Sequence, residues 1–174
     1  MKSGEIKEIK EYSLFKGLSA RELKLISGIV NKFEINAGSI IIREGDFGED
    51  LYLLEEGIVD ICKTLTLVTS KHDFGTKERT FIRLTGEDRC FFGEMVLFGN
   101  GERSATVKAV TNCTLFEIKK DDFRNLCESE PRIGYIVLTN IALMLADHLR
   151  KTNEDVVKLT TALSLALSGE QKKI

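Results

Sequence analysis

Hydrophobic residues follow a helical period near the start of the chain. The first forty residues are predicted to be mostly helical, with the clearest signal in LFKGLSARELKLISGIV, residues 14–30. Leu23, Ile26 and Val30 recur there at steps of three and four, the spacing of one helix face. Ser19 and Glu22 are spaced as a capping box, in which each side chain accepts a hydrogen bond from the other residue's backbone N–H. We therefore expect a helix that begins directly after Ser19.

From Lys32 onward the period changes. Short segments rich in β-branched and aromatic residues alternate with glycine or charged turns, in the order KFEI, SIIIRE, LYLLEEG, IVDICKTLTLV, RTFIRL, ATVKAV and TLFEIK. Glycine tolerates positive φ and so allows tight reversals, for which the first half of the region offers Gly38, Gly45, Gly48 and Gly57. The polar segment TSKHDFGTKE, residues 69–78, is predicted to be an extended hairpin loop. The pattern predicts a compact antiparallel β-domain and, with the flanking helices, the α+β class.

The C-terminal part returns to helical spacing. IKKDDFRNLCES predicts a short helix, and Pro131 then stands where the first turn of a helix tolerates proline. The long helix that follows carries an apolar stripe at steps of three or four: Leu138, Ile141, Leu145, Leu149, Thr152, Val156, Leu159, Leu163 and Leu167. We assign 1–130 to the N-terminal helices and β-domain, 131–168 to the long helix and 169–174 to a tail. The stripe up to about Leu149 can pack on its own domain, and the remainder predicts a homodimer through this helix.

Composition places the chain among ordinary globular proteins. It has 174 residues, of which 43% are hydrophobic and 30% charged, and a formal net charge of −2 argues against a nucleic-acid partner. No long uncharged apolar run and no signal peptide are visible, so we expect a cytoplasmic protein with no membrane partner. The four cysteines, Cys62, Cys90, Cys113 and Cys127, are widely spaced and are expected to be small core residues in strands. Two histidines and no catalytic constellation predict neither a metal site nor an enzyme.

The candidate chemistry lies in CFFGEMVLFGNGERSATVKAV, residues 90–110. A Gly93–Glu94 step that ends a strand and begins a helical turn bares backbone N–H groups and aims a carboxylate into the same space. Glu94 accepts hydrogen bonds and therefore fits a sugar hydroxyl, whereas Arg103 offers a planar fork of donors for an anion. Ser104 and the N–H of Ala105 can add bonds to the same anion. These residues predict a ligand with a sugar hydroxyl beside one phosphate; a surface ion pair between Glu94 and Arg103 is the alternative.

The segment FGEMVLFGNGERSATVKA resembles the phosphate-binding cassette of cyclic nucleotide-binding domains, as found in the catabolite activator protein, protein kinase A regulatory subunits and cyclic nucleotide-gated channels. The resemblance extends over about residues 13–160, since LFKGLSARELKLI, AGSIIIREGDFGEDLYLLEEGIVDI and ALMLADHLRKTNEDV are similar, in order, to that family's N-terminal helix, β-roll and C-terminal helix. It implies an antiparallel β-roll of the double-stranded β-helix or jelly-roll type, flanked by N-terminal helices and a long C-terminal helix.

The resemblance also implies a role for each site residue. Glu94 would bind the ribose 2′-hydroxyl and Arg103 the cyclic phosphate, while Gly93, Met95, Ser104 and Ala105 would line the pocket. Thr152 and Asn153 stand at the step where the activator's helix reaches the adenine, although the helix before them is about one turn longer here. Thr152 can equally be a polar residue that sets helix register. The approach GEDRCFFGE is longer than the family's usual Gly-Asp-x-x-Gly-Glu and contains Arg89 and Cys90.

The resulting functional hypothesis is a regulatory sensor domain that binds a cyclic nucleotide, with cAMP favoured over cGMP because RSA resembles the activator. Occupancy would be signalled by movement of the C-terminal helix. A ligand-free interaction or dimerisation domain is the alternative. The chain ends at SGEQKKI with no helix-turn-helix, so the output is expected in an unknown partner protein or in an effector domain that this chain lacks.

Overall fold

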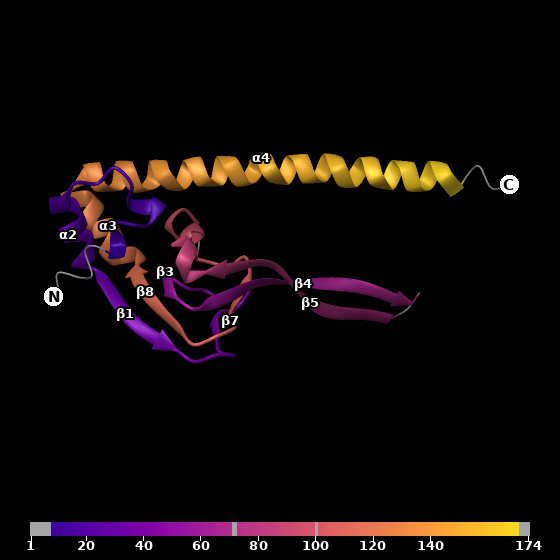
Figure 1. Cartoon of the computed structure of the whole chain (residues 1–174), viewed down its shortest axis with the longest axis horizontal. Coiled ribbons are helices and arrows are strands. Elements are labelled where there is room, and N and C mark those ends of the chain that lie inside the picture. Colours follow the sequence, from indigo (N-terminus) through magenta and orange to yellow (C-terminus); the bar gives the residue numbers. More distant parts are fainter. Residues whose placement is uncertain (1–7, 71–72, 100, 171–174) are drawn as a thin grey trace. The chain divides into compact units, whose positions relative to one another are not determined.

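The computed structural model describes residues 8–70, 73–99 and 101–170. The chain divides into two compact units, Met1–Val137 and Leu138–Ile174. Among the described residues, the first contains the strands and the shorter helices, and the second contains the long helix from Leu138 to Glu170 (Figure 1). This arrangement of two antiparallel sheets with N-terminal helices and a long C-terminal helix confirms the predicted fold class.

The N-terminal helical region is shorter than predicted. A 3₁₀ helix η1 (Ser13–Phe15) precedes α2 (Ala20–Ser27), and the capping box of Ser19 and Glu22 is present. Gly28 caps α2, and strand β1 already begins at Val30. The forty-residue helical prediction is therefore wrong beyond Gly28, because Phe33 and Ile35 alternate inward from a strand and do not continue the helix face.

Eight strands form two four-stranded sheets in which every described pairing is antiparallel. One sheet has the order β1-β8-β3-β6, with β1 at Val30–Ile35, β8 at Cys113–Lys119, β3 at Asp50–Glu56 and β6 at Phe91–Phe92. The other has the order β2-β7-β4-β5, with β2 at Ile40–Ile42, β7 at Thr106–Ala109, β4 at Ile58–Ser70 and β5 at Asp73–Thr85. All seven strand segments predicted from the alternating pattern are present, and β6 is the strand that was predicted to end at the Gly93–Glu94 step.

The core lies between the two sheets. Both contribute to one cluster of buried side chains, which comprises Ile42, Tyr52, Leu54, Val59, Phe92, Val107, Ala109, Cys113 and Leu115. All four cysteines are free; Cys62 and Cys113 are buried in strands as expected, whereas Cys90 and Cys127 are half-buried and lie outside strands, Cys127 on a helix. Among the four punctuating glycines, Gly38, Gly45 and Gly57 have positive φ, and Gly48 does not.

The predicted hairpin loop at residues 69–78 is mostly strand. β4 and β5 form a long hairpin (Figure 1), with Val68 paired to Phe74 and Ser70 to Asp73, so the prediction is wrong outside residues 71–72, which lie outside the described residues. Polar composition suggested a loop, but two paired strands satisfy each other's backbone groups whatever side chains they carry. β6 is absent from the alternating segments because two residues are too few to show alternation.

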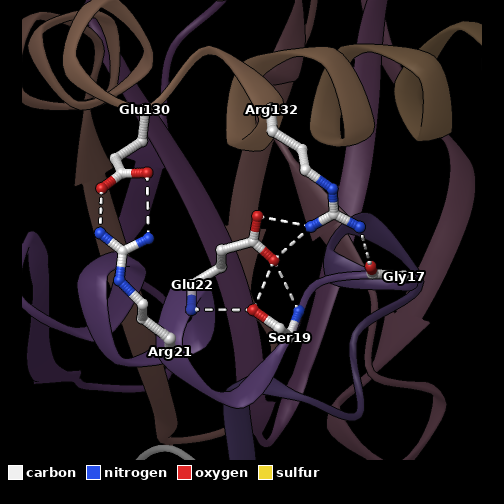
Figure 2. Close-up of polar contacts among 6 residues, drawn as sticks. All are labelled: Gly17, Ser19, Arg21, Glu22, Glu130 and Arg132. Atoms are coloured by element: carbon white, nitrogen blue, oxygen red, sulfur yellow. Dashed lines mark hydrogen bonds and ion pairs between the residues drawn. The ribbon is translucent and has the colours of Figure 1, made fainter.

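The predicted short helix is α3 (Lys120–Ser129), and the long helix is α4 (Pro131–Glu170). Two arginine–carboxylate pairs join α2 to the residues around the start of α4 (Figure 2). Arg21 forms a bidentate pair with Glu130, and Arg132 contacts the carboxylate of Glu22. Ser19 donates to the same carboxylate from its backbone N and its Oγ, both at 2.7 Å. One buried carboxylate therefore caps α2 and holds the first turn of α4.

The second unit is helical throughout its described part. From Leu138 onward, α4 exposes large apolar side chains along its length, among them Leu149, Val156, Leu159 and Leu163. Charged pairs such as Asp147 with Lys151, at 2.8 Å, lie between them. Within residues 8–70, 73–99 and 101–170, no helix combines the length and the apolar character needed to cross a bilayer.

Candidate functional site

A small cavity of about 120 Å³ opens between the two sheets, at the residues that the sequence singled out. Gly93, Glu94, Met95, Arg103, Ser104 and Ala105 all line it. The rest of its wall is mainly apolar and comes from both sheets: Ile42, Ile61, Phe92, Val96 and Val107, with Glu102 added. The structure therefore brings together the six predicted site residues that belong to the first unit.

Arg103 is the charged centre of this cavity and is only 7% exposed. Its Nη1 donates to the carbonyl oxygen of Asp50 at 2.9 Å, and the Asp50 carboxylate lies 4.0 Å from Nη2, beyond hydrogen-bond length. The ring of Tyr52 lies under the guanidinium, 5.9 Å from ring centroid to Cζ. A guanidinium carries five donors, so the fork retains N–H groups that can bind an anion in the cavity.

The backbone of Arg103 is fixed by the loop between β2 and β3. Its N–H donates to Asp46 O and its carbonyl accepts from Gly45 N, both at 2.9 Å, while Gly48 N donates to Gly101 O at 2.9 Å. Gly101 has φ of 87°, a left-handed conformation that glycine adopts freely, and it reverses the chain ahead of Arg103.

Glu94 begins the 3₁₀ helix η3 (Glu94–Leu97) directly after Gly93, whose φ is 81°. The sequence predicted a helical turn that begins at this glutamate, and the structure confirms it. Gly93 follows β6 and caps η3, and Glu94 lines the cavity together with Met95 and Val96 of the same turn. The cavity wall thus carries a carboxylate, which can accept hydrogen bonds from a hydroxyl group.

The remaining predicted residues form the cavity rim. Ser104 is exposed, and its Oγ lies 3.4 Å from Sδ of Met95, which is itself exposed. Ala105 is half-buried and begins the run into β7.

Two important residues of the site were missed from the sequence. Asp50 holds Arg103 through a backbone carbonyl, an interaction that no side-chain pattern reveals. Tyr52 donates to the Asp50 carboxylate at 3.4 Å and stacks on Phe92 with ring centroids 5.6 Å apart. Burial, with a smaller contribution from Asp50, raises the pKa of Tyr52 to about 12, so this phenol remains a hydrogen-bond donor at neutral pH.

Thr152 and Asn153 lie on α4 in the second unit, and their predicted contact with a base stays a prediction. Thr152 Oγ1 donates to His148 O at 2.9 Å, one turn earlier in the same helix. Its lone pairs remain available as acceptors, so this bond is compatible with either a base contact or a role in helix register. In the part of the chain that the structure describes, no three His, Cys, Asp or Glu residues are placed to hold a metal ion.

Comparison with known proteins gives one consistent result. The curated Cyclic AMP receptor protein of Thermus thermophilus is 32% identical over 146 residues, which are 83% of this chain and 61% of that protein. The crystal structure of the Thermus thermophilus Catabolite Activator Protein matches this chain with a TM-score of 0.70 at 31% identity. The match covers 85% of this chain and 63% of the activator chain. The regulatory domain of Toxoplasma gondii PKA, in a co-crystal with cAMP, matches with a TM-score of 0.59 at 28% identity. That match covers 72% of this chain and 46% of the PKA chain.

The chain thus spans about 61% of the length of the first curated relative. The sequence profile described as "Cyclic nucleotide-binding domain" matches residues 32–130, which run from β1 to the end of α3 and include the whole cavity wall. On this match and the two likenesses above 30% identity, the chain belongs to the cyclic nucleotide-binding domain family.

Proposed function

We propose that this chain is a regulatory domain that binds cAMP in the cavity around Arg103. The observation that carries the proposal is a guanidinium that is nearly buried, keeps donors for an anion and lines the same small cavity as Glu94. A buried charge is costly unless it is paired; the Asp50 carboxylate lies 4.0 Å away, and a cyclic phosphate would supply an anion in direct hydrogen-bond contact. Glu94 would accept the ribose 2′-hydroxyl, and Gly93, Met95, Ser104 and Ala105 would complete the wall.

The size of the cavity supports a divided binding site. About 120 Å³ is well below the roughly 300–1,000 Å³ of pockets that enclose a whole small molecule. The ribose phosphate would occupy this space, and the base would lie outside it. Contacts to the base would then come from elsewhere, for which Thr152 and Asn153 on α4 are the candidates.

Signalling would use the long helix. A ligand shifts a conformational equilibrium only by its different affinity for the two states, so contacts to the base from α4 would supply that difference. The apolar stripe of α4 would pair with the same helix of a second copy, and the output would reside in a partner protein or a further domain. The role is binding and regulation, not catalysis, as expected for relatives named as a receptor protein and a regulatory domain.

Isothermal titration with cAMP and with cGMP tests the ligand. We expect saturable binding of both, with cAMP the tighter, and a rise in melting temperature with ligand concentration. Tighter binding of cGMP would reverse the choice of base but keep the cavity assignment. No heat and no thermal shift at millimolar concentrations of either nucleotide would instead favour the ligand-free interaction domain. A Thr152→Ala variant with unchanged preference between the two nucleotides would remove Thr152 from the base contact.

A further inference from the structure

Arg89 is the one non-glycine residue with positive φ in residues 8–70, 73–99 and 101–170. Its φ of 48° and ψ of 47° are left-handed, a conformation that costs an L-residue free energy and persists only where neighbours hold it. Arg89 caps the 3₁₀ helix η2 (Gly86–Asp88), and its N–H donates to Gly86 O at 3.1 Å. The strain therefore lies in the segment that leads into β6 and the cavity.

The side chain of Arg89 is held by the N-terminal segment. Its Nε donates to Glu11 Oε2 at 2.9 Å, and its Nη1 donates to the carbonyl oxygen of Glu55 on β3 at 3.2 Å. The guanidinium also lies over the ring of Tyr12, 5.9 Å from the centroid, and Tyr12 is fully buried. Three separate contacts thus offset the backbone strain, and two of them come from residues just before η1.

The strand that follows Arg89 is too short for its own pairing to fix its register. β6 contains only Phe91 and Phe92, which pair with Leu53 and Tyr52 of β3, and Leu54 N donates to Cys90 O at 2.9 Å. A slip of one residue would turn Phe92, now 3% exposed in the core, to the opposite face. It would also displace Gly93 and Glu94, which follow immediately. For so short a strand, the preceding turn has to fix the register.

We propose that Arg89 is a positioning residue for the nucleotide site: its left-handed backbone sets the register of β6 and hence the place of Glu94, and Glu11 and Tyr12 hold it there. The N-terminal segment then controls the fraction of molecules whose cavity is correctly formed. The apparent affinity falls in proportion to that fraction. The inference rests on the proposed nucleotide binding, but its structural part can be measured without ligand.

The decisive variants separate the backbone conformation from the side chain. Arg89→Ala keeps the strain and removes the contacts, whereas Arg89→Gly removes the contacts and makes positive φ easy. We expect cAMP affinity to fall by about tenfold in Arg89→Ala and to stay within about threefold in Arg89→Gly. The amides of Leu54 and Val96 donate to Cys90 O and Gly93 O. In the unliganded protein, their hydrogen exchange should be faster in Arg89→Ala than in Arg89→Gly.

A second comparison tests the link to the N-terminal segment. Glu11→Gln should weaken cAMP binding about threefold alone and have no effect in the Arg89→Gly background. Arg83→Ala is the control, because Arg83 on β5 also pairs with a carboxylate, through two hydrogen bonds to Asp60 at 2.7 and 2.8 Å, but does not have positive φ. It should change neither affinity nor exchange at Leu54.

Two results would overturn the inference. Either Arg89→Ala matches the unaltered protein in exchange at Leu54 and Val96, or Arg89→Gly is as exchange-labile as Arg89→Ala. If the unaltered protein binds neither nucleotide, the proposed function fails, while the exchange order still decides whether Arg89 positions β6.

Discussion

The guanidinium of Arg103 occupies the space that any side chain at Gly48 would need. A Cβ at Gly48 would lie 2.5 Å from Nε and from Nη2 and 2.8 Å from Cζ, closer than real Cβ contacts come. Gly48 does not have positive φ, so the requirement for glycine is one of space and not of backbone conformation. The β2–β3 loop is therefore shaped around the arginine, which fixes where its donors point.

Gly48→Ala should weaken cAMP binding by about 1–3 kcal/mol, because the added methyl forces the guanidinium away from its place. Gly28→Ala is the control: Gly28 has ordinary φ, and its Cβ would lie 3.1 Å from Leu25 O, outside the cavity. Titration calorimetry on both variants, with melting temperatures for stability, makes the comparison. Equal cAMP affinities in Gly48→Ala and the unaltered protein would show that cAMP binding does not require Arg103 to keep this position.

Arg103→Ala should weaken cAMP binding by roughly 2–4 kcal/mol, because it removes a charge-assisted fork from a desolvated phosphate. The cAMP affinity of Arg103→Lys should lie between those of Arg103→Ala and the unaltered protein, since an ammonium keeps the charge and loses the bidentate geometry. Arg124→Ala, which breaks an exposed pair with Asp121 on α3, serves as the control and should bind normally. Unchanged affinity in Arg103→Ala would contradict the site assignment.

The sequence was a reliable guide wherever a residue's own chemistry or a period of several residues was involved. The capping box of Ser19 and Glu22 and the grouping of Glu94 with Arg103 were both predictable on that basis. Asp50 was not, because its carbonyl and not its side chain orients the arginine. The strain at Arg89 was also invisible, since arginine has no preference for positive φ and the contacts that hold it come from Glu11 and Tyr12, far away in sequence.

The pair of Glu22 and Arg132 predicts a specific loss of stability in acid. Hydrogen bonds from Arg132 and then Ser19 lower the pKa of Glu22 from 4.5 to about 2. Because the pKa is depressed in the folded state, ionised Glu22 stabilises the fold fully above about pH 4.5, and this stabilisation is lost as the pH falls toward 2. Glu22→Gln should therefore be less stable than the unaltered protein at pH 7, and the two should converge near pH 2.

Urea unfolding at a series of pH values between 7 and 2 measures this convergence. Asp121→Asn provides the control, because it removes an exposed carboxylate that pairs with Arg124 within one helix. The free energy of unfolding of Asp121→Asn should differ little from that of the unaltered protein at every pH in the series. A stability difference for Glu22→Gln that does not change with pH would mean that the ionised carboxylate is not what joins α2 to α4.

The apolar stripe of α4 predicts a dimer that one charge can break. Leu145, Thr152 and Leu159 recur at intervals of seven residues, as do Leu149, Val156 and Leu163, the two series of a coiled-coil seam. Val156, Leu159 and Leu163 are 55%, 71% and 61% exposed in the single chain, which leaves this apolar surface to a second copy. Leu159→Asp would place two buried carboxylates opposite each other and should shift the protein from dimer to monomer.

Sedimentation equilibrium over a range of protein concentrations measures that shift, with Thr161→Asp as the control. Thr161 is also exposed on α4 but lies outside both heptad series, so its carboxylate would remain in water in the dimer. Binding of cAMP by the Leu159→Asp monomer then separates two roles of the helix. Full affinity would mean that the cavity works within one chain, whereas a loss confined to Leu159→Asp would mean that pairing of the helices is needed to form the site around the base.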